Sequence, residues 1–509
     1  MSTITSKLAS GSSSASASTP AAAIVVGSGL AGLSAASQLI SRNVPVYLLE
    51  RASKPGGNSI KASSGINGAP TRFQPIHDTL FYDDTIRSAG AALNATASLT
   101  DHRRRLISTL TNASAGAIEW LVDEKGIDLS RVAQLGGHSV PRTHRGAGKL
   151  PPGAAIVTTL LNSLKASPLF HLQTGCHVTR VLHSSSNNAG QKGTQTQILH
   201  GPVIFASGGF AGDAKGMLAQ YRPDLAGYPS TNDPREGSQK LLSAVGAQLL
   251  DMDLVQVHPT GFVDTSSPTS PLKFLAAELL RGEGGILVRG DTGQRFVNEM
   301  ETREYITNVI TKLAPRTSFD NSPETKVPKQ WDVLLILDQG TYEAAPSHID
   351  FYLWKGLMKK TTVGSLAQQL NDPAGPPSES ALLETLKSYA ATVSTQKDAR
   401  FHRKTFGHWR LTDPATITPE TTIYVGRVTP VVHFTMGGVL IDENAQVLRP
   451  DSTPIKNVWA AGEVTGGIHG DNRLGGSSLL ECVVFGRIAG DQAAESLLER
   501  RQEHKELRV

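Results

Sequence analysis

Residues 21–50 read AAAIVVGSGLAGLSAASQLISRNVPVYLLE, and they predict a β-strand, a tight turn, an α-helix and a second β-strand. The apolar runs AAAIVV and VPVYLL have the continuous hydrophobic character of strands that are buried on both faces of a parallel sheet. Between them, the glycine-rich turn opens a run of small and apolar residues at helical spacing. This order is the βαβ unit, and it indicates a doubly wound α/β fold of the Rossmann type.

The turn GSGLAG at 27–32 has the GxGxxG spacing, in which each glycine has a task in binding a dinucleotide. Gly27 permits the tight turn, Gly29 lets the backbone approach a pyrophosphate, and Gly32 lets the helix pack closely on the strand. The helix N-terminus presents N–H groups and the positive end of the helix dipole to the phosphates. Glu50 ends the second strand about 20 residues later, where a carboxylate can bind ribose hydroxyls. The alternative is a structural turn without a ligand, which this complete context disfavours.

The GxGxxG turn alone leaves NAD and FAD open as the dinucleotide. The polar loop RASKPGGNS at 51–59 follows the ribose-binding acid directly and favours an extended FAD that lies across the sheet. Asn58 and Ser59 would then lie near the flavin end, where AAGEVTGG at 460–467 adds a further glycine turn. The predicted cofactor-binding residues are Gly27, Gly29, Leu30, Ala31, Gly32, Glu50, Arg51, Asn58, Ser59, Ser63, Ser64, Gly65, Glu463, Ser478 and Leu479.

Composition and charge exclude several other classes of protein. The chain has 509 residues, of which 39% are hydrophobic and 18% charged, so it suits two or three folded domains rather than a disordered protein. Its net charge of +4, without a block of Lys and Arg, does not fit a nucleic-acid interface. The two cysteines, Cys176 and Cys482, exclude a disulfide framework and a cluster held by four thiolates. The sequence has no CxxCH motif and no apolar run of about 18 residues, so we expect no covalent haem, no metal site and no membrane anchor.

Further buried strands at 201–210 and 457–467 indicate one sheet that is interrupted by an inserted domain. We expect an FAD-binding domain formed by 21–252 and 431–497, and an α+β capping domain at 253–430. Residues 1–20, rich in Ser, Ala and Thr, and residues 498–509 are expected to be flexible tails. The first tail lacks the apolar segment of a secretory signal and the arginines of a transit peptide, so we expect a cytoplasmic protein, with the mitochondrion as the alternative.

Seven separate blocks resemble the flavoprotein of the fumarate reductase and succinate dehydrogenase family, the FAD-dependent oxidoreductase 2 family, and most closely its soluble, fungal-type fumarate reductases. They occur in the family's order and span nearly the whole ordered chain. The blocks are GGNSIKASSGINGA (56–69), GGHSVPRTHR (136–145), VQVHPTGF (255–262), AAELLRGEGG (276–285), RFVNEMETREYIT (295–307), VVHFTMGG (431–438) and AGEVTGGIHGDNRLGGSSLLE (461–481).

The resemblance implies that a capping domain closes over the flavin and a small dicarboxylate, fumarate or succinate. Hydride passes from flavin N5 to one alkene carbon, and an arginine donates a proton to the other. The implied roles are Arg303 as proton donor, Glu278 and Arg281 as the relay that reprotonates it, and His258, His433 and Arg473 as the residues that bind the substrate carboxylates.

Each of these residues also has an ordinary structural interpretation. His258 could cap the Pro-Thr-Gly turn that follows it, and Arg473 could hydrogen-bond loop carbonyls. Glu278 and Arg281, at positions i and i+3, could be an exposed helical ion pair. The occurrence of all six residues in the family's order favours the catalytic interpretation.

Two departures from the family's pattern bear on cofactor and substrate. Membrane-bound relatives attach FAD covalently through a histidine where this chain has Asn58, so we expect noncovalent FAD. Bacterial relatives often have Thr before the relay glutamate, where this chain has Ala277, so the substrate could be another carboxylate. The alternatives are an ene-reductase, a desaturase or an oxidase of an amino dicarboxylate, and a non-catalytic flavin-binding protein. Because the sequence lacks ligands for haem or clusters, we expect a diffusible electron donor, reduced flavin or NADH.

Overall fold

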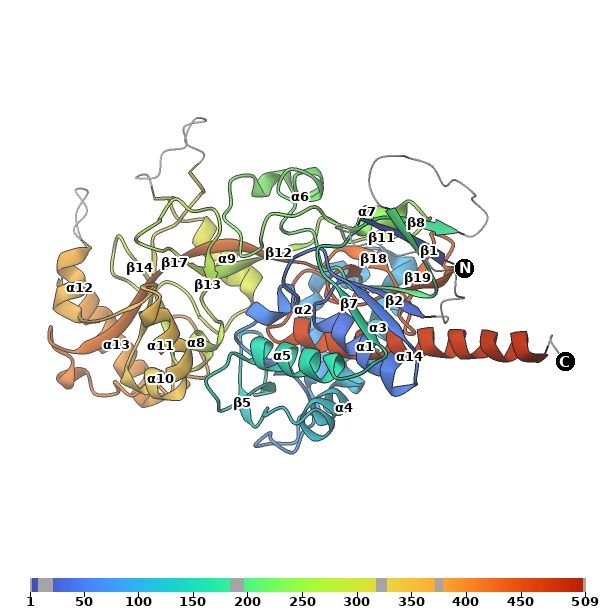
Figure 1. The fold of residues 1–509 in the computed structure, drawn as a ribbon. Helices are drawn as coiled ribbons and strands as arrows, with labels where there is room; N and C mark the ends of the chain where they lie inside the picture. Colours follow the sequence, from blue (N-terminus) through green and yellow to red (C-terminus); the bar gives the residue numbers. More distant parts are fainter. Residues whose placement is uncertain (1, 8–21, 184–195, 317–326, 371–378, 507–509) are drawn as a thin grey trace.

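The computed structural model describes residues 2–7, 22–183, 196–316, 327–370 and 379–506 of the chain. These residues form two lobes that lie side by side (Figure 1). One lobe is built on a mostly parallel sheet, and the other on an antiparallel sheet. This arrangement confirms the predicted doubly wound α/β fold with a second, α+β unit inserted into it.

The first lobe contains a six-stranded sheet in the order β19-β20-β10-β2-β3-β7. The strands from β20 to β7 are parallel, and β19 is antiparallel at the edge. After β2, the chain adds β3 and β7 on one side of β2, and it later adds β10 and β20 on the opposite side. The direction in which strands are added therefore reverses between β2 and β10. Ligands of such sheets bind outside the carboxyl ends of the strands at this reversal. The strands are β2 (Ala23–Val26), β3 (Val46–Leu49), β7 (Phe170–Gln173), β10 (Val203–Phe205), β19 (Gln446–Leu448) and β20 (Pro454–Ala460).

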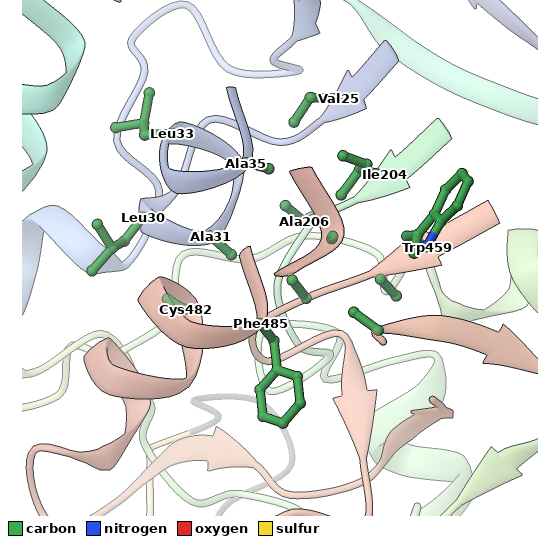
Figure 2. Packing of buried hydrophobic residues seen from close by; sticks show 14 of the residues in the cluster. Val25, Leu30, Ala31, Leu33, Ala35, Ile204, Ala206, Trp459, Cys482 and Phe485 are labelled. Atoms are coloured by element: carbon green, nitrogen blue, oxygen red, sulfur yellow. The ribbon is translucent and has the colours of Figure 1, made fainter. Parts of the chain in front are cut away.

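Helices α1 (Leu30–Ser41), α5 (Pro152–Lys165) and α14 (Ser477–Glu506) pack on this sheet. Figure 2 shows side chains of α1 and α14 meeting those of Val25, Ile204 and Trp459 from the strands. The two helices approach closely because glycines face the backbone of α1. A Cβ atom on Gly486 would lie 2.6 Å from the carbonyl oxygen of Ala31, and one on Gly490 would lie 2.6 Å from that of Ala35.

The second lobe contains an antiparallel sheet in the order β13-β12-β17-β15-β14, with β16 also pairing with β17. Strands β12 and β17 pair in register so that His258 lies opposite Val431 and Gln256 lies opposite Phe434. The strands are β12 (Val255–Phe262), β13 (Phe274–Leu275), β14 (Ile286–Arg289), β15 (Val333–Leu337), β16 (Lys359–Thr362) and β17 (Thr422–Thr435). The helices are α8 (Leu279–Gly282), α9 (Arg303–Thr311), α10 (Gln339–Ala344), α11 (Pro346–Trp354), α12 (Val363–Gln369) and α13 (Glu379–Thr395).

Three small sheets complete the described structure, in the orders β8-β1-β9, β11-β18-β21 and β4-β6-β5. Their strands are β1 (Ser2–Lys7), β4 (Ile66–Asn67), β5 (Arg131–Ala133), β6 (Thr143–Arg145), β8 (His177–His183), β9 (Thr196–His200), β11 (Leu249–Leu250), β18 (Gly438–Leu440) and β21 (Thr465–Gly466). The remaining helical elements are α2 (Phe81–Ala89), α3 (Thr100–Asn112), α4 (Ser114–Glu119), α6 (Met217–Tyr221), α7 (Gln239–Ser243), η1 (Ser59–Lys61), η2 (Gly90–Asn94), η3 (Ala97–Leu99), η4 (Trp120–Glu124), η5 (Pro223–Leu225) and η6 (Pro414–Thr416). Within the described ranges, no helix has the length and apolar character needed to cross a bilayer.

The two expected tails differ from the structure where it describes them. Residues 2–7 form β1, the middle strand of its sheet, because they pair with both β8 and β9; residues 8–21 lie outside the described residues. At the other end, α14 continues through residue 506, so most of 498–509 belongs to a helix. The domain boundaries stay a proposal, and β17 runs unbroken through the expected boundary at 430.

Candidate active site

A cavity of about 1020 Å³ opens at the carboxyl ends of β2 and β10 and reaches the second lobe. All predicted cofactor-binding residues except Gly32 line it. Gly32 instead faces the turn, because a Cβ atom there would lie 2.0 Å from the carbonyl oxygen of Gly27. The predicted residues are therefore brought together, with Gly32 in the packing position that the motif assigns to it.

The glycine turn has the geometry that a pyrophosphate requires. Gly27 has a φ angle of +104°, and a Cβ atom on it would lie 2.3 Å from the carbonyl oxygen of Ala206. At Gly29 a Cβ atom would meet nothing closer than the Ser59 hydroxyl at 3.5 Å, so this residue leaves the backbone open toward the cavity. Helix α1 begins directly after Gly29 and directs its N-terminal end at the same space. A phosphate group fits there by the hydrogen bonds and the dipole of the helix end.

Glu50 is held at the cavity wall in a fixed orientation. Its carboxylate accepts hydrogen bonds from the backbone N–H of Ser28 at 3.1 Å, the hydroxyl of Ser28 at 2.5 Å and the backbone N–H of Ala52 at 2.7 Å. Next to it, Arg51 donates to the carbonyl oxygen of Glu236 at 3.3 Å. A carboxylate positioned in this way can accept further hydrogen bonds from a ribose diol.

At the other end of the cavity, polar side chains are held by contacts between distant segments. The amide of Asn58 donates to the Oδ1 atom of Asn232 at 2.5 Å. The hydroxyl of Ser59 instead accepts from the Leu30 N–H at 3.1 Å, so Ser59 lies at the start of α1, beside the glycine turn. Burial raises the pKa of Glu463, whose carboxylate accepts from the backbone N–H of Thr435 at 3.0 Å. Ser478 lies in the first turn of α14, which brings a second helix N-terminus to the cavity. The cavity, its glycine turn, its carboxylate and its two helix ends fit an extended FAD.

The predicted proton donor and relay form a buried ion pair next to this cavity. Arg303 is the first residue of α9, which packs on β12, and its side chain lines the cavity while remaining 5% exposed. Its Nε atom donates to the Oε2 atom of Glu278 at 2.6 Å. The backbone N–H of Gly136 donates to the Oε1 atom of Glu278 at 2.9 Å. Burial raises the pKa of Glu278, but the positive charges of Arg303 and Arg281 outweigh it and hold this pKa below its usual value.

The third relay residue, Arg281, is also buried, which overturns the interpretation of the pair as an exposed one. Its Nη2 atom lies 3.7 Å from the Oε1 atom of Glu278, and its Nη1 atom donates to the carbonyl oxygen of Glu299 at 2.6 Å. Within the described residues, its Nε and Nη2 atoms have no hydrogen-bond partner. Arg281, Glu278 and Arg303 thus form a contiguous row of charged groups.

Gln256 links two of the arginines, and the sequence analysis did not select it. Its Oε1 atom accepts from Arg303 at 2.8 Å and from Arg473 at 3.1 Å. Its amide nitrogen donates to the Arg473 carbonyl oxygen at 2.9 Å. The available signal was its place two residues before His258 in a strand, which puts both side chains on one face.

The positive charge of the Arg473 guanidinium is less well neutralised by neighbouring groups than that of Arg303. Among the described residues it forms no ion pair, and its Nε atom has no hydrogen-bond partner. Its guanidinium lies 4.2 Å above the ring centre of Phe434. Burial, followed by the positive charge of Arg303, lowers the pKa of Arg473 to about 9. A buried cation in this state is stabilised by an anionic ligand.

The two predicted histidines lie together because β12 and β17 are neighbours. The ring centres of His258 and His433 are 5.4 Å apart. The Nδ1 atom of His258 accepts from the backbone N–H of Thr260 at 3.2 Å, so the neutral ring carries its proton on Nε2. Among the described residues, this Nε2 atom is buried without a partner. Burial and the nearby positive charge of Arg303 lower the pKa of both histidines well below its ordinary value, so both rings are neutral donors at neutral pH.

Two further groups at the site were also not selected from the sequence. The Nε2 atom of His138 donates to the Gly475 carbonyl oxygen at 3.0 Å, and burial lowers the pKa of His138 to about 4. Tyr352 lines the cavity, and its hydroxyl accepts from the backbone N–H of Ala277 at 3.2 Å. A tyrosine hydroxyl therefore lies beside the position where the sequence has Ala277. His138 lies in the block 136–145 that carries part of the family resemblance, which was the available signal, whereas no local pattern points to Tyr352.

The charges of the cluster define what it can bind. Arg303, Arg281 and Arg473 carry three positive charges, and Glu278 is the carboxylate that contacts two of them. Glu299, which lies nearby, is paired with Arg295 and Arg403. The pocket therefore has excess positive charge, an arrangement that suits a small dianion. His258 does not line the cavity; its ring, with the free N–H donor, lies beside that of His433, which does.

The chain is similar to known flavoproteins along most of its length. Residues 22–479 match the model of a family described as FAD binding domain. Fumarate reductase 1 of Saccharomyces cerevisiae is 43% identical over 491 residues, which cover 92% of this chain and 98% of that protein. Fumarate reductase of Schizosaccharomyces pombe is 37% identical over 501 residues, which cover 94% of this chain and 90% of that protein.

Among solved structures, the open conformation of a flavocytochrome c3 fumarate reductase has a TM-score of 0.68 to this chain. The two are 28% identical, and the match covers 95% of this chain and 79% of that one. The similarity therefore extends over both lobes and the cavity between them.

Proposed function

Since the chain belongs to this FAD-binding-domain family of flavoproteins, we propose that it is an FAD-dependent fumarate reductase, which converts fumarate to succinate. The family match confirms the predicted cofactor, FAD. The observation that carries the proposal is the buried pair of guanidiniums, Arg303 and Arg473, which share the neutral oxygen of Gln256 beside the cofactor cavity. Together with Arg281 these guanidiniums have one carboxylate partner, Glu278, among the residues of the cluster. Fumarate has two carboxylates, so it supplies the negative charge that the cluster lacks.

The substrate carboxylates are bound by the cationic and neutral donors of the pocket. Arg473 offers its unpaired Nε–H and His258 its unpaired Nε2–H, while the ring of His433 lines the same cavity. Both donor groups are buried, so water competes little for them, and their hydrogen bonds to an anion are strong. Binding both carboxylates fixes the alkene in one orientation, which lowers the entropic part of the barrier.

The reaction adds one hydride and one proton to the alkene. FAD, held by the glycine turn, Glu50 and the helix ends that line the cavity, would supply the hydride to one carbon when bound in its reduced form. Arg303, which lines the cavity, donates the proton to the other carbon. Glu278 hydrogen-bonds to the Nε atom of Arg303 and returns a proton to it, and Arg281 is the next group along the row. The positive charge around the substrate stabilises the negative charge that develops as hydride arrives.

A reoxidation screen tests this function. The FAD-loaded protein is reduced under anaerobic conditions and mixed with fumarate or with unsaturated monocarboxylates of similar size. We expect fumarate to reoxidise the flavin rapidly and to saturate at lower concentration than any monocarboxylate, because a dianion compensates the excess positive charge of the three arginines and one glutamate better than a monoanion does. A reduced flavin that fumarate does not reoxidise would overturn the proposal.

Ala277 favours a second candidate, reduction of a different unsaturated carboxylate. Its methyl group offers no hydrogen bond, and the hydroxyl of Tyr352 beside it already donates to the Leu275 carbonyl oxygen at 3.0 Å. A substrate without a hydrogen-bonding group near Ala277 would therefore lose no hydrogen bond to the protein. The same screen decides, because this candidate requires a monocarboxylate or larger acid to outcompete fumarate.

We further propose that FAD is bound noncovalently, since the Asn58 amide is not a nucleophile and is engaged with Asn232. Unfolding the purified protein in acid and removing it by precipitation is expected to leave all the flavin in solution. Flavin that stays with the precipitated chain would contradict this.

We propose that the electron donor is diffusible and that it is a reduced flavin, with NADH as the alternative. We propose that the compartment is the cytoplasm, with the mitochondrion as the alternative. Microscopy of the tagged full-length chain tests the compartment. A chain that lacks residues 1–20 is a poor control, because β1 would be lost from its sheet.

A further inference from the structure

A buried histidine, His138, lies behind the predicted proton relay without lining the cavity. Its Nε2 atom lies 3.0 Å from the carbonyl oxygen of Gly475, and its Nδ1 atom lies 3.0 Å from the Nη1 atom of Arg142. A guanidinium can only donate hydrogen bonds, so the Nδ1 atom accepts and the Nε2–H group donates to Gly475. The partners of His138 thus fix both the tautomer and the orientation of its ring.

The guanidinium of Arg142 is itself held in place by two carboxylates. Its Nε atom donates to Asp78 at 2.7 Å, and its Nη1 atom also donates to Asp84 of α2 at 2.6 Å. All three side chains are fully buried. Removing one member of such a buried group leaves an uncompensated charge, so its arrangement is strongly favoured. The two carboxylates therefore fix Arg142, Arg142 fixes His138, and His138 fixes the loop at 472–476.

The carbonyl group that His138 holds belongs to a residue that packs against the relay. A Cβ atom on Gly475 would lie 2.7 Å from the Oε2 atom of Glu278 and 3.1 Å from the Nη2 atom of Arg303. This Oε2 atom is also the one that pairs with Arg303. The backbone of Gly475 therefore lies directly against the ion pair, and a shift of this loop would move the surface on which both charged groups rest.

The segment that precedes His138 holds the other carboxylate oxygen of Glu278. The backbone N–H of Gly136 donates to its Oε1 atom at 2.9 Å. The segment approaches closely because Gly136 has no side chain, since a Cβ atom there would lie 2.5 Å from the carbonyl oxygen of Glu301. One oxygen of Glu278 is thus fixed two residues before His138, and the other lies against the loop that His138 holds.

We propose that His138 is a positioning residue of the proton relay, which it aligns by donating a hydrogen bond to the Gly475 carbonyl oxygen. The inference rests on the proposed function, because it concerns the proton that Glu278 returns to Arg303. Proton transfer between these groups requires that they stay within hydrogen-bond distance, and small displacements cost large factors in rate. Burial and the positive charge of Arg142 lower the pKa of His138 to about 4, so the neutral ring orients the relay without adding a charge.

The arginine on the same loop that binds the substrate is held by a separate contact. The amide of Gln256 donates to the carbonyl oxygen of Arg473 at 2.9 Å, and its Oε1 atom accepts from the Nη2 atom of Arg473 at 3.1 Å. The Gly475 carbonyl oxygen also accepts from the amide of Asn67 at 2.8 Å. Loss of the His138 contact is therefore expected to slow proton transfer while the loop stays folded and fumarate binding stays near that of the wild type.

Single-turnover reoxidation of pre-reduced, FAD-loaded enzyme by fumarate, in H2O and in D2O, tests this role. We expect His138→Leu to lower the rate at saturating fumarate by about tenfold and to increase the solvent isotope effect, with an unchanged half-saturating concentration. His138→Gln keeps an N–H group in reach of Gly475 and is expected to restore most of the rate. His138→Ala, which introduces no new bulk, provides the same comparison if the leucine variant does not fold.

The matched control is His102→Leu. The Nε2 atom of this buried histidine donates to the Ile441 carbonyl oxygen at 2.7 Å, so the substitution removes the same kind of contact away from the relay. We expect this variant to react at the wild-type rate. Hydrogen exchange of the segments 134–138 and 472–477 adds a measurement that needs no turnover. Exchange there should be faster in His138→Leu than in the wild type and unchanged in His102→Leu.

Failure of the positioning role and failure of the proposed function are distinguishable. A wild type that fumarate does not reoxidise refutes the proposed function, and hydrogen exchange then still tests the role of His138. Wild-type exchange of both segments in His138→Leu would overturn the inference in either case. With an active wild type, an unchanged rate and isotope effect in His138→Leu would overturn it. So would a raised half-saturating concentration at an unchanged rate, or an equal loss of rate in His138→Leu and His138→Gln.

Discussion

Gln256 controls the charge of the site although it is neutral itself. Its oxygen orients Arg303 and Arg473 without cancelling their charge. Gln256→Glu would pair both guanidiniums with a carboxylate, so we predict that it raises the KM for fumarate by about tenfold or more. Steady-state kinetics at a fixed donor concentration measure this, with Gln220→Glu on the exposed side of α6 as the control. An unchanged KM in Gln256→Glu would show that the pair does not bind the substrate.

Residues could be predicted where their role depends on local spacing. Glu278 and Arg281 are three positions apart, so their proximity follows from one helical turn, and the glycines of 27–32 act through the turn that they form. The contacts of Gln256 and His138 depend on how β12, the 136–145 segment and the 472–476 loop come together. Such contacts arise from tertiary packing, and the spacing of residues within one segment does not predict them.

At the scale of elements, the approach of α14 to α1 sets the position of the phosphate-binding helix end. Gly486 and Gly490 permit this approach. We predict that Gly486→Ala destabilises the protein by about 1–3 kcal/mol, because the added methyl group overlaps the Ala31 carbonyl oxygen, and that it also weakens FAD binding. Thermal unfolding and FAD titration measure both effects.

Gly116 in α4 is the matched control, since a Cβ atom there would meet nothing within 4 Å. Gly116→Ala is expected to be neutral or to stabilise by about 0.5–1 kcal/mol through the unfolded state. Equal effects of the two substitutions would argue that close helix packing is unimportant.

The elements themselves were predictable to different degrees. The strand–turn–helix–strand unit at 21–50 is local, and the structure has it as β2, α1 and β3. The composition of residues 1–20 suggested a tail. Residues 2–7 instead form β1, which lies between β8 and β9 and pairs with both strands. Strand pairing of this kind depends on distant partners, so composition alone misled the prediction.

For the molecule as a whole, stability is expected to depend on pH through the charge cluster around Glu283. Arg145, from β6, donates to Glu283 at 2.8 Å, and His408, which like Glu283 belongs to the expected capping domain, contacts the other oxygen of Glu283 at 2.7 Å. The hydrogen bond to Glu283 raises the pKa of His408, against partial burial and the positive charges of Arg145 and Arg410, which lower it. Because the pKa of His408 is higher in the folded than in the unfolded protein, protonation of this ring stabilises the fold. The stabilisation is fully present below the unfolded-state pKa of about 6.5 and is lost as the pH rises through the folded-state pKa.

We therefore predict that His408→Gln lowers the Tm more at about pH 6 than at about pH 8.5. Thermal unfolding of wild type and variant at the two pH values measures the difference, which should be modest because the ring of His408 is largely exposed. A gap between wild type and variant that widens with rising pH would contradict the assigned sign.

The central claim is that Arg303 delivers a proton to a dianion held in this buried cationic pocket. Single-turnover reoxidation of pre-reduced, FAD-loaded enzyme by fumarate tests it directly, because no external donor takes part. We predict that Arg303→Gln slows reoxidation by about 10²–10⁴-fold, as loss of a general acid does, while the FAD content stays that of the wild type. Tyr305→Phe, on an exposed residue of the same helix, should react at the wild-type rate. Reoxidation of FAD-loaded Arg303→Gln at the wild-type rate would contradict the account.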